Sequence, residues 1–472
     1  MTRTGLWLLA ALAALAQAPD LHGRRTETLL IRNAMVLEGV GTPVSGPRDI
    51  LIQGNRIARM MPSGGKPVEA KAVIDASGKY VLPGFINLHG HVQDERGGAA
   101  MEVDYVLKLW LAAGITTVRD VGSNFEKSRA LRAKSAEGTI AAPRLYLYPF
   151  FTARTPEEAV KQVRELKEKG ADGMKHLGTH RDVMTAMRGE AANLGMRTAH
   201  HVGVEETNAW DDIRLGTTSI EHWYGIPDAA IADGVQNFPP SYNYQNETDR
   251  FRYAGRLWRE ADPERLGKVL QAMADAGVAW DPTLNIYEAS RDLMRAQNQP
   301  WFKEYLHPAL EKFFQPNLSN HGSFFFGWTT ADEVYWKENY RIWMAALKEF
   351  ARRGGVIGTG EDAGFIYQIQ GFGYIRELEL HQEAGFHPLA VIKHATYNGA
   401  RVLGKQTEIG RVRAGWLADL IVVNGNPQED FKMLYPTAGR IEWTIKDGIP
   451  YHAPTLAADV RQLVAKARES NR

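Results

Sequence analysis

The chain has 472 residues, of which 44% are hydrophobic and 24% charged, as in an ordinary globular protein. Its formal net charge of +1 gives no basic excess to attract nucleic acid or anionic lipid, so neither is expected as a partner. The absence of cysteine excludes disulfides, thiolate metal ligands and a cysteine nucleophile.

Residues 1–18 have the pattern of a secretory signal peptide. Arg3 precedes the ten-residue apolar run LWLLAALAAL, which is too short to span a bilayer comfortably, and Ala16 and Ala18 are suitable cleavage positions. An uncleaved anchor is the alternative. We expect a secreted or periplasmic protein without stable membrane insertion, because no later stretch approaches ~20 apolar residues.

Residues 27–80 and 406–452 both predict short strands separated by turns. The segment 441–448, for example, has a strand pattern followed by the hairpin signal Asp-Gly. We predict that the two ends of the chain pair into one small β-sandwich domain. Residues 453–472 are expected to form a C-terminal helix.

The segment between these ends, residues 81–405, alternates strand and helix patterns, which favours parallel strands with helices outside. The clearest helix follows Thr155, which together with Glu158 predicts a capping box. The predicted fold class is therefore α/β, a (β/α)₈ TIM barrel. Its eight candidate strands are Val81–His89, Thr116–Val121, Arg144–Phe150, Gly173–Leu177, Arg197–Val202, Thr218–Trp223, Ala279–Leu284 and Val356–Asp362.

A region around 236–345 interrupts this alternation and predicts a lid-like insertion. It contains one candidate strand and many aromatic residues, which form either the core of a subdomain or the wall of a substrate pocket. These residues are Tyr242, Tyr244, Phe251, Tyr253, Trp258, Trp301, Phe302, Phe313, Phe314, Phe324–Phe326, Trp328, Trp336 and Trp343.

Candidate metal ligands lie at the C-terminal ends of the predicted strands, where barrel enzymes have their active sites. His89 and His91 are two residues apart, so in a strand both rings face the same side and can bind one ion. Lys175 lies inside the fourth strand, where a buried amine is costly unless it is paired or modified. A carboxylated lysine there would be an anionic ligand able to bridge two metals, whereas an unmodified one would extend its amine to solvent.

Three further candidates end later strands: His200 the fifth, His222 the sixth and Asp362 the eighth. His201 adjoins His200 and should face the opposite way, and we expect His200 to be the ligand. The carboxylate of Asp362 can bind a metal and accept a proton from its water. Each residue alone has a structural explanation, but the ordered set predicts a metal centre.

In these motifs the sequence resembles the amidohydrolase superfamily, within it the imidazolonepropionase-related and Xaa-Pro dipeptidase (prolidase)-like branch. The resemblance implies two divalent metal ions, expected to be zinc, held by His89, His91, Lys175, His200, His222 and Asp362, with Lys175 carboxylated. The chain departs from the family pattern at Asn87, Glu361 and the run His200-His201-Val202. The motifs that carry the resemblance are VLPGFINLHGH (81–91), GITTVRDVG (114–122), GADGMK (170–175), SIEH (219–222), GEDAG (360–364), ATYNGAR (395–401) and GWLADLIV (415–422).

The predicted function is a secreted, metal-dependent amidohydrolase that cleaves an amide or peptide bond in a dipeptide or N-acyl amino acid. A hydroxide shared by the metals would attack, with Asp362 as general base and then acid. Arg119 and Tyr224 are candidates to bind a substrate carboxylate or the oxyanion. A cyclic amide or lactone hydrolase is the alternative, and a non-catalytic binding protein on a hydrolase scaffold is a second. The expected partner is the small-molecule substrate, and homo-oligomerisation stays open.

Overall fold

The computed structural model describes residues 21–203, 206–232, 238–243, 246–317, 325 and 327–470. The expected signal peptide at 1–18 lies outside the described residues, as do Tyr244, Phe324 and Phe326. No helix within the described ranges is both long and apolar enough to cross a membrane.

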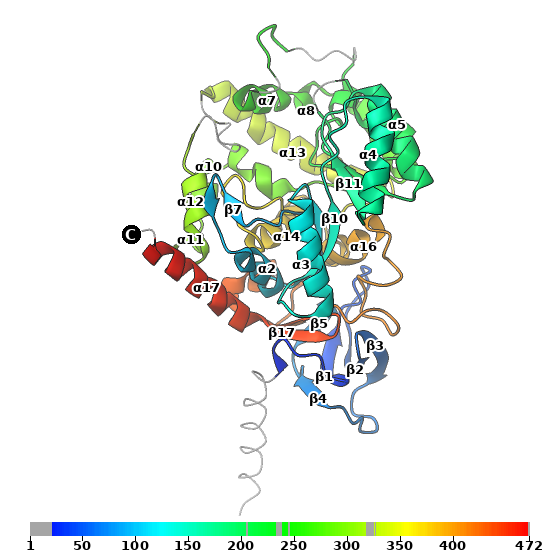
Figure 1. Ribbon diagram of the computed structural model, residues 1–472, viewed down its shortest axis with the longest axis vertical. Helices are drawn as coiled ribbons and strands as arrows, with labels where there is room; N and C mark the ends of the chain where they lie inside the picture. The colour runs from blue at the N-terminus through cyan, green and yellow to red at the C-terminus, as the bar shows by residue number, and fades with distance from the viewer. Residues whose placement is uncertain are drawn as a thin grey trace, which may run out of the picture.

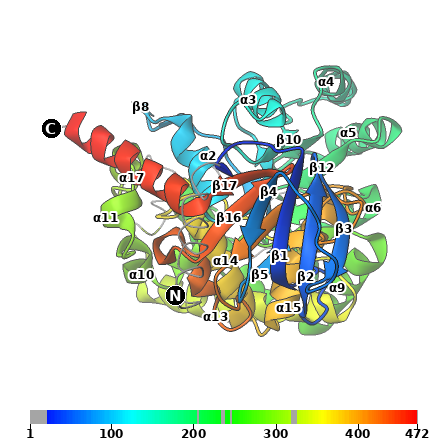
Figure 2. The ribbon, with the colours of Figure 1, turned by 90° about the horizontal axis from the view of Figure 1, so that it is seen from below.

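Strands from both ends of the chain form one sheet in the order β17-β16-β15-β5-β1-β2-β3, with β4 beside β1. Figure 2 shows the early strands next to β16. Apolar residues on one face, among them Ile31 and Ile50, form a buried cluster of their own. The strands are β1 (Thr28–Val36), β2 (Ser45–Gln53), β3 (Arg56–Pro62), β4 (Ala72–Asp75), β5 (Tyr80–Pro83), β15 (Leu420–Val423), β16 (Ile441–Lys446) and β17 (Ile449–His452).

The first described residues are fixed to this terminal sheet. The backbone N–H of Gly23 donates to the carbonyl of Pro450 over 2.8 Å. The N–H of His452 donates to Nδ1 of His22 over 3.0 Å. Residues 22–23 therefore pack against β17, so the first described residues lie beside a strand that comes late in the chain.

Seven parallel strands form two further sheets, β10-β9-β6 and β11-β12-β13-β14. Backbone contacts join them: Phe150 bridges to Lys175 and Trp280 to Ile357, and the N–H of Leu88 donates to Thr359 over 3.0 Å. The strands are β6 (Phe85–Gly90), β9 (Ile115–Val121), β10 (Arg144–Tyr148), β11 (Gly173–His176), β12 (Arg197–His200), β13 (Ser219–Glu221) and β14 (Ala279–Asp281).

Two of the predicted strands differ from the structure. The first, Val81–His89, is divided at Gly84 into β5 of the terminal sheet and β6 of a parallel sheet. A Cβ at Gly84 would lie 2.1 Å from Oγ1 of Thr116, so only glycine allows this close crossing. The last, Val356–Asp362, makes a single bridge at Ile357 rather than a regular strand.

Helices follow the parallel strands and cover them on the outside (Figure 1). At the start of α4, Thr155 accepts from the N–H of Glu158, while the Glu158 carboxylate accepts from Arg154 rather than from the cap residue itself. The helices outside the insertion are α2 (Val103–Ala112), α3 (Phe125–Glu137), α4 (Pro156–Glu168), α5 (Arg181–Asn193), α6 (Ala209–Leu215), α14 (Phe372–Glu383), α15 (Pro388–Lys393), α16 (Gly399–Val402) and α17 (Ala453–Ser470).

The region around 236–345 is mainly helical, and its described aromatic residues are largely buried. Trp258, Trp336 and Trp343 are each at most 1% exposed and belong to the main core cluster. The 3₁₀ segment Leu284–Ser290 extends this core towards the strands. The helices here are α7 (Glu247–Ala254), α8 (Leu257–Glu260), α9 (Pro263–Ala276), α10 (Leu293–Gln297), α11 (Phe302–Tyr305), α12 (Pro308–Phe313) and α13 (Thr330–Arg352).

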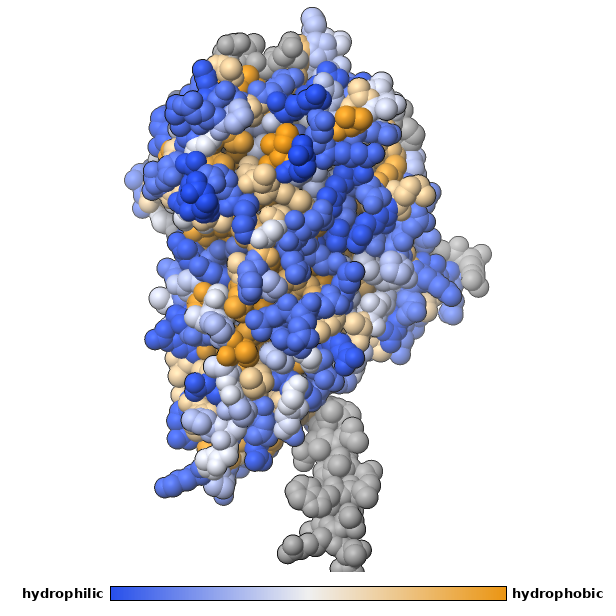
Figure 3. Space-filling model, turned by 180° about the vertical axis from the view of Figure 1, so that it is seen from behind, coloured by the Kyte–Doolittle hydropathy of each residue, from blue (hydrophilic) through white to orange (hydrophobic). Residues whose placement is uncertain are grey.

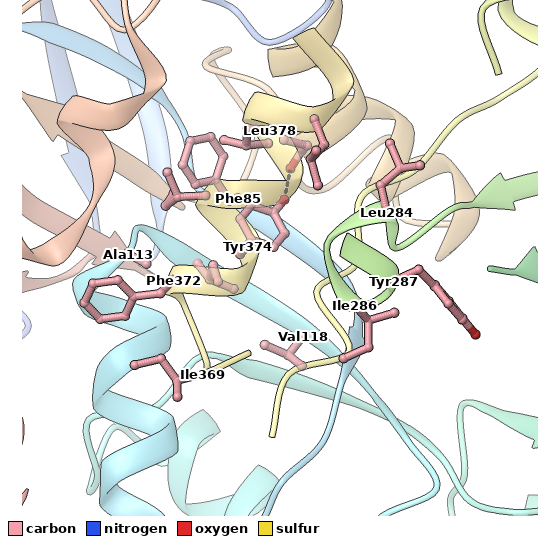
Figure 4. Close-up of a cluster of buried hydrophobic side chains, with 14 of the residues drawn as sticks. Phe85, Ala113, Val118, Leu284, Ile286, Tyr287, Ile369, Phe372, Tyr374 and Leu378 are labelled. Atoms are coloured by element: carbon pink, nitrogen blue, oxygen red, sulfur yellow. Dashed lines mark hydrogen bonds between the residues drawn. The ribbon is translucent and has the colours of Figure 1, made fainter. Parts of the chain in front are cut away.

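Part of the main core is drawn in Figure 4, where Phe85 of β6 and Val118 of β9 lie with Phe372 and Tyr374 of α14. The Tyr374 hydroxyl donates to the carbonyl of Ile86 over 3.0 Å, which satisfies a polar group inside the apolar cluster. The face shown in Figure 3 is mostly hydrophilic, with small scattered apolar groups. The buried apolar side chains of Figure 4 pack β6 and β9 against α14, and β6 and β9 carry predicted site residues.

Candidate metal centre

Four of the predicted ligands converge at the C-terminal ends of the parallel strands. Nε2 of His91 lies 3.0 Å from Oδ1 of Asp362, and Nε2 of His89 lies 3.6 Å from the same oxygen. Nε2 of His222 lies 3.8 Å from Oδ2 of Asp362. The side chains of His91 and Asp362 are 14% and 15% exposed, so the cluster retains some contact with solvent.

Lys175 completes this group from β11. Its side chain is 3% exposed, and its Nζ lies 3.4 Å from Nε2 of His89 and 4.0 Å from the nearest oxygen of Glu221. Burial lowers the pKa of this amine, and Glu221 and Asp362 offset the effect only in part. The amine therefore points into the cluster without a closely bonded carboxylate.

Neighbouring side chains orient the imidazole rings. Nδ1 of His89 lies 2.8 Å from Oε2 of Glu221, and Nδ1 of His222 lies 2.5 Å from Oγ1 of Thr283. An outer partner on Nδ1 leaves Nε2 directed at the cluster, as in metal-ligating histidines. Glu221 and Thr283 were not predicted from the sequence, although Glu221 directly precedes His222 in the motif SIEH.

The backbone has a positive φ at two residues of the cluster. His222 has a φ of 61°, in a region that residues other than glycine, asparagine and aspartate seldom adopt, so its backbone is strained. Such strain costs about 1–3 kcal/mol and is concentrated at functional sites. Asp362 has a φ of 45°, in the same region, which aspartate tolerates.

His200 does not join this group, contrary to the prediction. It is fully buried on β12, its Nδ1 lies 2.8 Å from Asp212 of α6, and its ring stacks on His176 at 3.8 Å. The ring of His201 instead lies 4.6 Å from that of His222. Because neighbouring residues of a strand face opposite sides, His200 faces the helices and His201 the cluster.

Arg119 also lies elsewhere than expected. It is fully buried, and its guanidinium donates to Ser219 over 2.8 Å and to Glu221 over 2.8 and 2.9 Å. Asp281 is 3.3 Å away, and Arg119 Nε donates to the carbonyl of Leu88. This network holds the acids beneath His89, so Arg119 is not positioned to bind a substrate. Asp281 was not predicted from the sequence.

Tyr224 lies beside the cluster, in an aromatic wall. Its ring stacks on that of His201 at 5.1 Å, and it is 1% exposed. Tyr287 lies 5.5 Å edge-on to His222 and stacks on Trp336 at 6.0 Å. Aromatic residues of the insertion therefore pack directly against the predicted site.

Charge within the cluster favours neutral imidazoles and an ionised Asp362. Burial, reinforced by Lys175, lowers the pKa of both His89 and His222 well below the ordinary value. Burial alone would raise the pKa of Asp362, but His89, His91 and Lys175 outweigh it and lower that pKa. Neutral imidazole nitrogens and a carboxylate are the donors that divalent zinc prefers.

Two of the three departures from the family pattern, Asn87 and Glu361, contact each other. Nδ2 of Asn87 donates to Oε1 of Glu361 over 3.0 Å, and the N–H of Glu361 donates back to the Asn87 side chain. Trp110 also donates to this carboxyl group. Burial raises the pKa of Glu361 to about 8, against these hydrogen bonds. Glu361 is therefore held beneath the site and away from the cluster.

Parallel strands covered by helices, with histidines and an aspartate converging near their C-terminal ends, form a candidate metal centre in an α/β fold. The model of the amidohydrolase family matches residues 80–234 and 343–449, more than half of the chain. The chain therefore belongs to the amidohydrolase family. The unmatched stretch between the two blocks falls almost entirely within the region around 236–345.

Among curated proteins, the chain is similar to D-hydantoinase of Streptomyces coelicolor, with 28% identity over 177 residues. The match covers 35% of this chain and 38% of that enzyme, so it spans well under half of the relative. A solved Xaa-Pro dipeptidase with methionine bound in its active site has a TM-score of 0.65 at 21% identity, covering 90% of this chain and 100% of that one. Bottromycin amidohydrolase has a TM-score of 0.71 at 18% identity, covering 96% and 93%. At these identities the structural likeness concerns the fold.

Proposed function

We propose that this protein is a secreted, metal-dependent hydrolase of an amide or peptide bond. The observation that carries the proposal is the convergence of His89, His91, His222 and Asp362, with the buried Lys175 at the same point. Membership of the amidohydrolase family supports it. A non-catalytic binding protein with the fold of a hydrolase would be expected to lack one or more of these side chains.

The donor set fits two divalent cations, with zinc as the expected metal. We assign His89, His91, Lys175, His201, His222 and Asp362 as the residues that would hold them, with His201 replacing the predicted His200. The lowered pKa of Lys175 supports carboxylation, because only a neutral amine adds carbon dioxide to form a carbamate. When bound, the metals would activate water as a nucleophile at neutral pH and polarise the scissile carbonyl.

Asp362 has the charge and position to move the proton. Its lowered pKa keeps it ionised at neutral pH, so it can accept a proton from the attacking water. Its partial exposure lets it then deliver the proton to the leaving nitrogen. Tyr224, beside His201, is the remaining candidate to bind the oxyanion or a substrate carboxylate.

The architecture proposed with this function is a (β/α)₈ barrel formed by residues 81–405. The backbone contacts that join the two parallel sheets to each other and to the segment around Ile357 support it. The terminal strands would form the sandwich domain of 27–80 and 406–452. Residues 1–18 would direct the chain to secretion or to the periplasm.

The proposed substrate is a dipeptide or an N-acyl amino acid. The fold shared with an Xaa-Pro dipeptidase supports this choice. A cyclic amide or lactone is the second candidate, supported by the similarity to D-hydantoinase.

The test is to purify the chain without residues 1–16, measure its metal content, and assay Xaa-Pro dipeptides, N-acyl amino acids, cyclic amides and lactones. We expect about two divalent ions per chain and hydrolysis of one amide class. Lys175→Ala should lose metal and Asp362→Ala should lose activity. Lys446→Ala, which removes another buried lysine, at the end of β16 in the terminal sheet, is the matched control and should keep both. Absence of metal after zinc addition, or activity that survives both site variants, would refute the proposal.

A further inference from the structure

Arg96 lies next to the proposed site on a short hairpin that follows His91. Strands β7 (Glu95–Arg96) and β8 (Ala99–Ala100) pair around Gly97 and Gly98, whose φ values are 54° and 76°. Positive φ at both central residues is the requirement of a tight two-residue hairpin turn, and two glycines meet it without strain. The turn therefore fixes the position of the Arg96 backbone.

Two phenylalanine rings hold the guanidinium group of Arg96. Its central carbon lies 3.6 Å from the ring centroid of Phe365 and 4.3 Å from that of Phe313, on α12. The Phe365 ring also lies edge-on to the ring of His91, at 5.4 Å. The Phe365 ring thus contacts both Arg96 and His91, a proposed metal ligand.

Two of the three nitrogens of this guanidinium are buried without a hydrogen-bond partner among the described residues. Nε and Nη2 of Arg96 have almost no solvent contact and make no hydrogen bond with any described residue. A buried guanidinium with two unsatisfied donors is costly, whereas a carboxylate can accept both hydrogen bonds in the plane of the group. Burial lowers the pKa of Arg96 to about 10, while Asp362 and Glu95 act in the opposite direction, so the group stays charged at neutral pH.

We propose that Arg96 is a substrate-binding residue that recognises a carboxylate, and that the enzyme therefore selects amides whose amine part carries one. This inference rests on the proposed amide hydrolysis and specifies its substrate class. The aromatic rings keep the guanidinium fixed and dry, so little freedom is lost when the carboxylate binds. It favours dipeptides and N-acyl amino acids over cyclic amides and lactones without an acid group.

The test compares pairs of compounds that differ only in the carboxylate. Metal-loaded wild-type protein, Arg96→Met and Arg96→Lys are assayed with N-acetyl-L-phenylalanine, N-acetyl-L-leucine and N-acetyl-L-proline, each against the N-acetyl amide of the decarboxylated amine. Binding of the free amino acids and of the same amines is measured by calorimetry. Arg413→Met is the matched control, because Arg413 also lies over an aromatic ring, that of Trp416, in a segment hydrogen-bonded to β3 of the terminal sheet.

We expect the wild type to prefer the carboxylate member of a pair by roughly 10- to 100-fold in kcat/KM and in binding. Arg96→Met should abolish the preference with metal content unchanged, Arg96→Lys should keep part of it, and Arg413→Met all of it. No preference in the wild type, undetectable binding of every amino acid, or a preference that survives Arg96→Met would overturn the inference. Loss of hydrolysis alone would refute the proposed function, because the binding experiment does not require turnover.

Discussion

His200 and His201 are neighbours in sequence, but their side chains lie on opposite sides of the backbone and have different surroundings. His200 pairs with Asp212 on the helix side, while His201 lies beside His222 and Tyr224. The two side chains are identical in chemistry, so variants of each provide a matched pair. Their behaviour separates a metal ligand from a packing residue.

We predict that His201→Asn lowers metal content and reduces activity by at least about 100-fold. His200→Asn should retain the metal but lower the free energy of unfolding by about 1–3 kcal/mol, because Asp212 loses its buried partner. Elemental analysis and urea unfolding of both variants check this. Metal loss in His200→Asn with full occupancy in His201→Asn would restore the original ligand assignment.

For individual residues, the orientation of a side chain could be predicted where the spacing between two residues determines it. His89 and His91 are two residues apart, so their rings were expected on the same side, and both lie beside Asp362 in the structure. The direction of His200 depends on where its strand begins to pair with β11, which the local pattern does not encode. Arg119 was misassigned because its partners Glu221 and Asp281 are more than 100 residues away in sequence.

At the scale of an element, β16 carries a buried lysine between the terminal sheet and α3. Lys446 is fully buried, donates to the carbonyl of Ser135 over 2.5 Å and lies 3.3 Å from Asp447. Burial lowers the pKa of Lys446, and Asp447 offsets this only in part. Protonation therefore costs more in the folded protein than in the unfolded chain.

We predict that Lys446→Met removes part of the pH dependence of stability. Between the lowered folded pKa and the unfolded value of about 10.4, the unfolded chain binds more protons, so the free energy of unfolding rises with pH. The wild type should gain stability relative to Lys446→Met between pH 7 and pH 10, measured by urea unfolding. Lys79→Met, on the rim of the same sheet, is the control. Parallel pH profiles for wild type and Lys446→Met would contradict the prediction.

Elements were predicted best where apolar periodicity and turn signals agreed, as in α4 after Thr155 and in β16 before its Asp-Gly turn. The division of residues 81–89 between two sheets was missed, because the apolar run continues through Gly84. Its cause is the close approach of Thr116, a contact between distant residues. The helices of the region around 236–345 were not predicted individually. Buried aromatic residues hold them together, and these residues do not follow a regular helical spacing in the sequence.

At the scale of the whole molecule, the terminal sheet and the parallel strands share one core. Ile421 of β15 and Ile441 of β16 belong to the same buried cluster as Trp110 of α2. Thr444 donates to the carbonyl of Leu111 over 2.6 Å, and Arg144 pairs with Asp419. The boundary at residue 405 therefore crosses a continuous apolar interior.

We predict that residues 81–405 alone do not fold cooperatively, whereas residues 21–470 unfold in one transition. Removing β15 and β16 exposes the apolar surface of α2 and leaves Arg144 without its buried partner. Differential scanning calorimetry and dye binding to exposed apolar surface would compare the two chains. A cooperative transition in the 81–405 fragment would instead mean that the terminal sheet is a separable domain.

The contact of residues 22–23 with β17 has a practical consequence for immobilisation. Gly84, directly before β6, donates its N–H to the carbonyl of Asp419, directly before β15 of the terminal sheet, while His89 and His91 lie at the other end of β6. Figure 1 likewise shows the terminal sheet at one end of the molecule and α7 and α13 at the other. A support coupled ahead of Leu21 would therefore hold the protein at the terminal sheet, with the proposed metal centre directed away from the support.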